Sequence, residues 1–148
     1  MRISAKGRYA LAAMISMAQN YENGEYITVI SLSEKLGVSK IYLEQVFSLL
    51  KRSSLLNSTK GAQGGYRLTR APRLISVLDI LSAIELSLFE KAEEAVAVKA
   101  PEIDRAMRAA AFEPLDEAVR TVLQQITLVD LINEVEKQKT DHNFMFFI

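Results

Sequence analysis

The chain has 148 residues, of which 49% are hydrophobic and 24% are charged, a balance typical of a globular protein with a buried core. It contains no cysteine, which excludes disulfides, a thiolate nucleophile and any zinc or iron–sulfur site held by cysteine. No apolar run reaches the ~20 residues that a membrane-spanning helix needs, and no signal peptide is present. We therefore expect a cytoplasmic protein with no membrane partner.

The formal net charge is zero, but the charges are unevenly distributed along the chain. Residues 1–80 carry eleven basic and five acidic side chains, a net charge of +6, and the remaining residues carry seven basic and thirteen acidic ones, a net charge of −6. A basic half joined to an acidic half is typical of a DNA-binding domain with an attached partner domain, with chance segregation as the alternative.

The first predicted helix covers residues 4–20, with Ser4 as its N-cap. The side chains of Arg2, Lys6 and Arg8 surround its N-terminal amides, and this combination suits a phosphate. A basic terminus that is simply solvated is the alternative. Gly7 leaves room in the first turn for a close approach by another group. The helix is apolar on two sides, so we expect it to be buried between two bodies.

Two short helices are predicted between Ser31 and Arg52. The first begins with the capping box Ser31-x-x-Glu34 and ends at Gly37. The second follows Ser39 as N-cap, and its buried stripe has helical spacing over Leu43, Val46, Phe47 and Leu50. Two short helices around a glycine-containing turn, with polar groups on the outer face of the second, predict a helix-turn-helix.

Strand-like segments follow at 55–59 and 66–69, separated by the glycine-rich turn 60–65. Lys60 and Arg67 lie beside small residues there, so the backbone can approach a phosphate closely. A helix-turn-helix followed by a basic hairpin predicts a winged helix. A helical pair and a ribbon that merely pack together would show the same pattern. The predicted fold class is mainly α with a small β-hairpin wing.

Beyond Pro72, Ser76-x-x-Asp79 caps a helix so apolar that it belongs in the core. Residues 86–101 show no clear pattern, and we interpret them as a connector. A long helix is predicted from Glu102, in which Pro114 introduces a kink or a new start; the kink is favoured because the apolar stripe stays in phase. The stripe consists of Leu115, Ala118, Val119, Val122, Leu123 and Ile126.

This stripe has no core left to cover, since the winged helix closes its own, and we expect it to form a dimer interface with a second copy. Packing onto its own domain is the alternative. Thr127-x-x-Asp130 caps a last helix, and the apolar tail 142–148 is expected to dock rather than fray. The predicted units are a DNA-binding domain (1–85), a connector (86–101) and a dimerisation helix with C-terminal helix and tail (102–148).

Four motifs carry a resemblance to a known family. They are Met1-Arg-Ile-Ser-Ala-Lys-Gly-Arg-Tyr-Ala10, Tyr42-Leu-Glu-Gln45, Gly61-x-x-Gly-Gly-Tyr66 and Ile126-Thr-Leu128. Together they resemble the Rrf-type transcription regulators, which include the iron–sulfur cluster regulator, the nitric-oxide-sensing repressor and the cysteine-metabolism repressor of bacteria. The resemblance covers nearly the whole chain. It implies a homodimeric winged-helix DNA-binding protein whose long helices cross at the two-fold axis.

One departure from the family concerns its cofactor. Many members hold an iron–sulfur cluster on three cysteines between the fourth helix and the long helix, but the corresponding stretch here, about 87–101, has none. We therefore expect no cluster, no other cofactor and no metal site, and sensing through a cluster is excluded. An unidentified small-molecule or protein effector, or no effector at all, remains open.

We expect a transcription regulator, specifically a repressor, that binds a pseudo-palindromic operator in double-stranded DNA as a homodimer. The residues expected at base edges are Lys40, Tyr42, Glu44, Gln45 and Ser48. Glu44 suits a cytosine amino group; its alternative is a surface salt bridge with Lys40 or Lys51. The residues expected at phosphates are Arg2, Lys6, Arg8, Lys51, Lys60, Gly64, Gly65 and Arg67.

Two other classes of function are alternatives to this one. A winged helix that serves as a protein–protein interaction module with no DNA role would show no salt-dependent DNA binding. An enzyme is disfavoured, because the chain has no nucleophile elbow, Walker loop or metal-spaced histidines, and we expect no catalytic residues.

Overall fold

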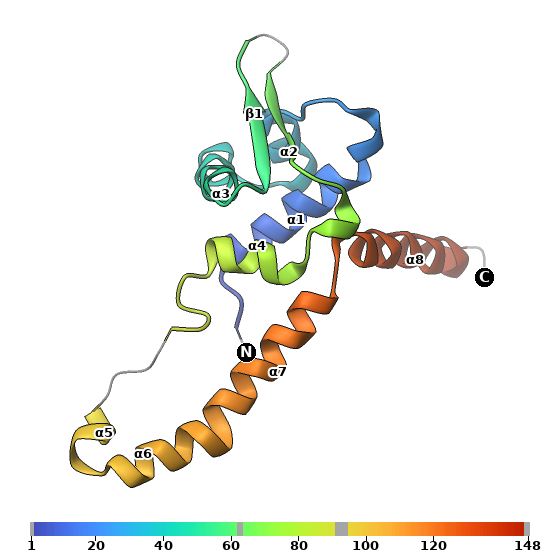
Figure 1. The fold of residues 1–148 in the computed structure, drawn as a ribbon. Coiled ribbons are helices and arrows are strands. Elements are labelled where there is room, and N and C mark those ends of the chain that lie inside the picture. Colours follow the sequence, from blue (N-terminus) through green and yellow to red (C-terminus); the bar gives the residue numbers. More distant parts are fainter. Residues whose placement is uncertain (1, 62–63, 91–94, 147–148) are drawn as a thin grey trace.

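The computed structural model describes residues 2–61, 64–90 and 95–146. Within these residues the chain is mostly helical, and the single sheet is a two-stranded antiparallel hairpin, which confirms the predicted fold class (Figure 1). Parts of the predicted glycine-rich turn (62–63), of the connector (91–94) and of the apolar tail (147–148) lie outside the described residues. No described helix is both long enough and apolar enough to cross a bilayer.

The first half of the chain forms a compact body around the helix α1. Its elements are α1 (Ala5–Gln19), the 3₁₀ turn η1 (Tyr21–Asn23), α2 (Val29–Leu36), α3 (Lys40–Arg52), β1 (Leu56–Thr59), β2 (Gly65–Leu68), the 3₁₀ turn η2 (Pro72–Leu74) and α4 (Val77–Ile84). Helix α1 contacts α2, α3, α4 and β2, so it is enclosed on several sides, as its two apolar faces predicted.

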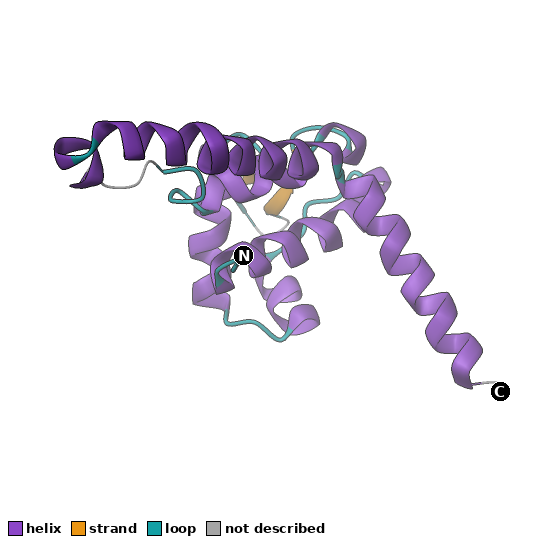
Figure 2. Ribbon diagram, turned by 90° about the horizontal axis from the view of Figure 1, so that it is seen from below, coloured by secondary structure: helices purple, strands orange, loops and turns teal. Residues whose placement is uncertain are grey.

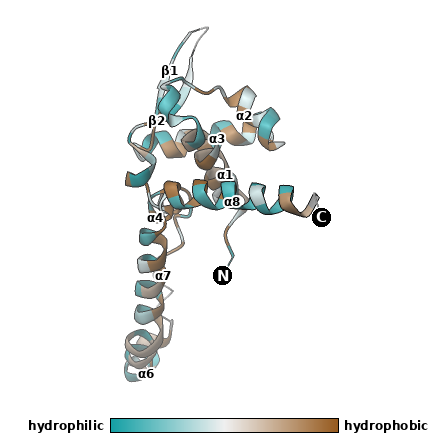
Figure 3. Cartoon of the chain, turned by 90° about the vertical axis from the view of Figure 1, so that its right-hand side faces the viewer, coloured by the Kyte–Doolittle hydropathy of each residue, from teal (hydrophilic) through white to brown (hydrophobic). Residues whose placement is uncertain are grey.

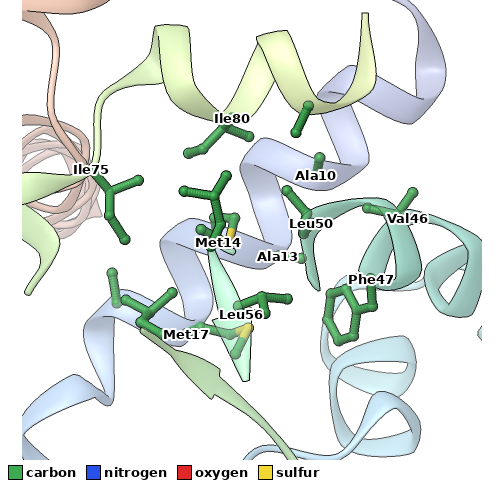
Figure 4. Close-up of a cluster of buried hydrophobic side chains, with 14 of the residues drawn as sticks. Ala10, Ala13, Met14, Met17, Val46, Phe47, Leu50, Leu56, Ile75 and Ile80 are labelled. Carbon is green, nitrogen blue, oxygen red and sulfur yellow. The ribbon is translucent and has the colours of Figure 1, made fainter. Parts of the chain in front are cut away.

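The core lies where α1, α3, α4 and the hairpin meet (Figure 4). Met14 and Met17 from α1 are buried against side chains from α3 and α4, among them Phe47 and Ile80. The ring of Phe47 also packs edge-on against Tyr66 of β2, with the ring centroids 4.9 Å apart. The second helix of the helix-turn-helix and the wing are therefore fixed to one another through the core.

The predicted capping box at Ser31 is wrong. Helix α2 begins one turn earlier, because the Thr28 hydroxyl accepts from the Ser31 amide at 3.1 Å, and the Ser31 hydroxyl donates to the Thr28 carbonyl at 2.9 Å. The other predicted boundaries of the helix-turn-helix are confirmed. Gly37 ends α2 with φ 66°, and Ser39 caps α3 by accepting from the Tyr42 amide at 3.3 Å.

The wing joins α3 through a tight left-handed turn. Ser54 has φ 61°, its amide donates to the Lys51 carbonyl, and the Leu55 amide donates to the Leu50 carbonyl, which together form a Schellman motif. The hairpin pairs Leu56 with Leu68 and Thr59 with Gly65 at its two ends. Two main-chain hydrogen bonds between Ile27 and Tyr66 also join β2 to the segment before α2. The wing is thus attached to the body at both strands.

The second half of the chain extends away from this body (Figures 1 and 2). After the short helix α5 (Ala95–Lys99), a rod of helix is formed by α6 (Pro101–Met107), the π-helical segment η3 (Arg108–Phe112) and α7 (Glu113–Gln125). Helical backbone continues across Pro114, so no new helix starts there. The five-residue π segment lies just before the proline, where the Glu113 amide donates to the Arg108 carbonyl five residues back.

A short extended joint connects the rod to the body. The Val77 amide donates to the Ile126 carbonyl at 2.8 Å, and the Leu128 amide donates to the Ile75 carbonyl at 3.0 Å. Both predicted caps beside this joint are confirmed: Ser76 with Asp79, and Thr127 with Asp130. The joint therefore places two helix N-termini, those of α4 and α8, side by side.

The last helix, α8 (Leu128–Phe146), begins in the core and ends in solvent. Leu128 is fully buried, and α8 contacts α1, so residues of the predicted C-terminal unit help to close the first one. The far end of α8 projects from the body (Figure 2), and Met145 is 77% exposed. Phe144 is also exposed, at 66%, so the described part of the predicted tail does not dock on its own chain.

Candidate nucleic-acid interface

The side of α3 that faces away from the core carries a row of four solvent-exposed side chains. Their positions are i, i+4, i+7 and i+11 along the helix, so they lie on one face opposite the buried stripe. The row consists of Ile41, Gln45, Ser48 and Arg52. Two of the predicted base-edge residues, Gln45 and Ser48, are thus at the centre of the accessible face.

A second row on α3 lies toward the wing. Lys40, Glu44 and Lys51 share this flank, and the Lys51 ammonium donates to the Ser58 hydroxyl on β1 at 2.6 Å. Lys40 and Glu44 form the surface salt bridge that was the alternative for Glu44, with the nitrogen and oxygen 3.8 Å apart and both side chains about half exposed. Such an exposed pair contributes only about 0.3–0.5 kcal/mol, so Glu44 is free to exchange this partner for another.

Tyr42 occupies the opposite flank of α3, toward α1. Its ring is half-buried and meets the ring of Tyr9 edge-on, with the centroids 5.1 Å apart. This contact couples the first turns of α1 to the start of α3. The base contact expected of Tyr42 is still a prediction. The observed contact with Tyr9 gives the Tyr42 ring a more direct role in fixing the orientation of α3.

Sequence reasoning missed Ile41. It is 69% exposed and stands in the row that faces outward, one residue inside the start of α3. The signal was available in the spacing, because position 41 falls opposite the buried stripe of α3. It was overlooked because only polar side chains were considered as readers of DNA.

The two faces of the wing carry different residues. Tyr66 and Ser58 are paired in the hairpin and face α3, whereas Arg67 is paired with Asn57 and points to the other side. The guanidinium of Arg67 lies 4.7 Å above the Tyr26 ring. Lys60 is exposed at the end of β1. Among the predicted phosphate contacts, Lys51 therefore lies on α3 beside the wing, Lys60 follows β1 toward the hairpin turn, and Arg67 points to the face of the wing away from α3.

Gly64 and Gly65 of the wing are required by packing inside the protein. A Cβ on Gly65 would lie 2.6 Å from the Ile27 carbonyl oxygen, and one on Gly64 would lie 2.5 Å from the Thr59 carbonyl oxygen. Both contacts are too close for any side chain. The absence of a side chain at these two positions is thus explained by the hairpin itself, and their phosphate contact stays a prediction.

Two amides at the N-terminus of α1, those of Ser4 and Gly7, already have partners within the protein. The Glu85 carboxylate at the end of α4 accepts from the Ser4 amide at 2.8 Å and from the Ser4 hydroxyl, and Ser4 in turn caps the Gly7 amide. An anion of the protein's own therefore occupies this helix end. The close approach expected at Gly7 is confirmed, since a Cβ there would lie 2.5 Å from a Glu85 oxygen. Arg2 and Arg8 remain exposed nearby, and Lys6 is half-buried.

The apolar stripe of α7 is only partly covered in the single chain. No residue of α7 is buried, and Leu115 and Val122 are 61% and 56% exposed. Ala118 is exposed, and Val119, Leu123 and Ile126 are partly covered. Figure 3 shows the helix extending from the body with hydrophobic residues among hydrophilic ones. Helix α7 contacts α4, so the alternative in which this helix packs onto its own domain is met in part, while Leu115 and Val122 stay exposed.

A helix-turn-helix with a hairpin wing and an accessible outer face on its second helix defines a winged-helix DNA-binding protein. The family model described as Rrf2, an iron-dependent transcriptional regulator, matches residues 3–134. The chain belongs to this Rrf2 family of transcriptional regulators, which are not enzymes, and the predicted resemblance is confirmed.

Individual relatives agree with the family assignment. The transcriptional regulator IscR of Klebsiella pneumoniae (strain 342) is 35% identical over 137 residues, which cover 92% of this chain and 82% of that protein. ORF2 of Azotobacter vinelandii, named as an HTH-type transcriptional regulator, is 41% identical over 88 residues, which cover 60% of this chain and only 53% of that protein. The solved structure of CymR, titled the global cysteine regulator of B. subtilis, aligns with a TM-score of 0.71 and 31% identity over 90% of this chain and 98% of that one.

The iron dependence in the family description does not fit the residues of this chain. With no cysteine in 148 residues, it has no thiolate ligands for an iron–sulfur cluster. In the part of the chain that the structure describes, no three His, Cys, Asp or Glu side chains gather as a metal site. Beside the predicted connector, Arg108 donates to the Asp104 carboxylate at 2.7 Å, and the Arg120 guanidinium lies 3.8 Å above the Phe89 ring.

Proposed function

We propose that this DNA-binding transcription regulator acts as a homodimer that reads a pseudo-palindromic operator, with one α3 in the major groove of each half-site. The observation that carries the proposal is the outward row of α3, which is solvated on a body whose core is otherwise closed. Repression is the proposed sign of regulation, because occupancy of an operator blocks transcription without any further contact, whereas activation needs a surface that recruits the polymerase.

The apolar stripe of α7 supports the homodimer. Leu115, Ala118 and Val122 remain exposed along this stripe, which is an unstable arrangement in water, and an identical helix is a complementary cover. Pairing at the rod leaves both outward faces of α3 accessible, since rod and wing lie on different sides of the body (Figure 1). Two DNA-reading heads on one rigid assembly fit two half-sites.

The dimer is tested with a charge placed in the stripe. Val122→Asp introduces a carboxylate into the proposed interface, and sedimentation should show a monomer. The matched control is Gln124→Asp on the opposite side of α7, which should remain a dimer. A wild-type chain that sediments as a monomer, or a Val122→Asp variant that remains dimeric, would reject this interface.

The roles on DNA divide between specificity and affinity. Glu44 can accept from a cytosine amino group and repels phosphates, so Glu44→Ala should mainly relax base preference. Lys51 and Lys60 flank the groove side of the wing and suit phosphates, so Lys60→Ala should weaken binding to all sequences alike. For Lys60→Ala, the slope of the logarithm of the binding constant against the logarithm of the salt concentration should fall in magnitude by about one unit.

The experiment is fluorescence-polarisation binding of full-length protein to a duplex selected from a random library and to a scrambled duplex, over a range of salt concentrations. Lys139→Ala on the exposed end of α8 is the control for loss of a remote positive charge. If Glu44→Ala and Lys60→Ala change both duplexes identically, the proposed division of roles fails. Binding that shows no salt dependence would favour the protein-interaction alternative.

A further inference from the structure

Among the residues that the structure describes, Ile41 is the large apolar side chain that stands on the reading face of α3. It is 69% exposed, and it does not belong to the core cluster or to the residues packed against it. Its neighbours in the row, Gln45 and Ser48, are polar and exposed. Ile41 therefore offers an isolated hydrocarbon surface inside a polar face.

The fold gives no reason for an isoleucine at this position. A β-branched side chain loses rotamer freedom in a helix, and glutamate, lysine or glutamine would favour the helix more while remaining solvated. Burial normally compensates for such a choice, and Ile41 is not buried. The N-cap bond from the Tyr42 amide to Ser39 fixes the first turn of α3 without involving the isoleucine side chain.

The location of Ile41 is that of a base-contacting residue. Recognition helices present their N-terminal residues to base edges, and Ile41 is the second residue of α3, facing outward. Tyr42 is turned aside onto Tyr9, so it does not cover this position. The Lys40–Glu44 pair lies on the flank toward the wing, which leaves the isoleucine side chain as the first outward group.

We infer that Ile41 is a specificity-determining residue that contacts the C5-methyl group of a thymine in each half-site of the operator. The inference rests on the proposed function, because it requires α3 to lie in the major groove. Thymine is the base with a methyl group on its major-groove edge, so a hydrocarbon side chain has one favourable partner there. Opposite cytosine, the same side chain would cover an amino donor without accepting from it, which disfavours that base.

The experiment uses the selected duplex and removes thymine methyl groups individually. Deoxyuridine pairs like thymidine but lacks the methyl, so each thymine is replaced in turn and binding is measured by fluorescence polarisation. At one position in each half-site, the wild-type affinity should fall about fourfold, which is the ~0.8 kcal/mol of one buried methylene converted at 1.4 kcal/mol per factor of ten.

Coupling between the two partners is the decisive readout. The Ile41→Ala variant should bind the thymine duplex more weakly than the wild type does, and it should lose its sensitivity to deoxyuridine at that position alone. The matched control is Ile30→Ala, which truncates another isoleucine on the helix-turn-helix that is 53% exposed, and which should keep the sensitivity. Thermal melting of both variants establishes that they fold.

Two results separate the inference from the proposed function. Suppose that the selection enriches an operator. The inference alone is then overturned if wild-type binding is insensitive to every deoxyuridine replacement, or if the Ile41→Ala variant keeps the full sensitivity. A selection that enriches no sequence, together with equal binding to all duplexes, overturns the proposed function and the inference together.

Discussion

The attachment of the wing can be tested at Gly65. Two hydrogen bonds of 2.8 Å between Ile27 and Tyr66 hold β2 against the segment before α2. Gly65 precedes Tyr66, has φ 152°, and would place a Cβ 2.6 Å from the Ile27 carbonyl oxygen and 2.8 Å from its carbon. Both of these near atoms are backbone. They cannot rotate away, so Gly65→Ala must displace the strand from the body.

The expected cost combines backbone strain with lost hydrogen bonds. A non-glycine residue in this backbone region costs about 1–3 kcal/mol. Losing the two bridge bonds costs about 0.5–1.5 kcal/mol each, which brings the total to about 2–6 kcal/mol. Small domains are stable by about 5–15 kcal/mol, so the variant should fold, with a clearly lower urea midpoint. The Ile27 and Tyr66 amides should also exchange faster with solvent than the amides of α1.

The control for Gly65→Ala is Gly61→Ala. Gly61 also has a positive φ, 109°, but a Cβ there would meet nothing within 4 Å, so this substitution introduces strain without a clash. Urea unfolding and amide exchange of the two variants are compared side by side. Equal losses of stability, with the Ile27 and Tyr66 amides still protected in Gly65→Ala, would refute the view that the bridge makes Gly65 necessary.

Two further substitutions test local features of the fold. Ser54→Gly should stabilise the protein by about 0.5–1 kcal/mol, because glycine adopts the left-handed φ of 61° without the steric cost that serine has. Urea unfolding should show a higher midpoint for this variant. The control, Ser53→Gly at φ −85°, should show no increase in the midpoint. Glu85→Gln should destabilise by about 0.5–1.5 kcal/mol, because the carboxylate at the start of α1 loses its charge; an effect no larger than that of Glu117→Gln on exposed α7 would contradict this role.

Local signals in the sequence predicted most of the fold. The N-caps at Ser4, Ser39, Ser76 and Thr127 depend on residues three positions apart, and each was found in the structure. The capping box at Ser31 failed because Thr28 offers an equivalent hydroxyl three residues earlier, and the chain before it is already extended. Two rival caps within one turn cannot be ranked from sequence alone.

Contacts between distant segments were beyond the sequence patterns. The carboxylate of Glu85 accepts from the Ser4 amide across 81 positions, and this contact places an acidic group beside the basic N-terminus. Leu128, assigned to the C-terminal unit, lies in the core of the first one. At the candidate interface, the spacing placed Gln45 and Ser48 outward, but it did not reveal that Tyr42 pairs with Tyr9 and that Ile41 takes the accessible position.

The joint between rod and body has a geometric consequence for any paired assembly. Two main-chain bonds, Val77 to Ile126 and Leu128 to Ile75, determine how α7 leaves the body, and three helix ends converge on them. If the rods pair, this angle sets the distance between the two reading heads, and thus the number of base pairs between half-site centres. A substitution at Ile75, which lies outside the apolar stripe, would then change the preferred operator spacing while leaving the preferred bases unaltered.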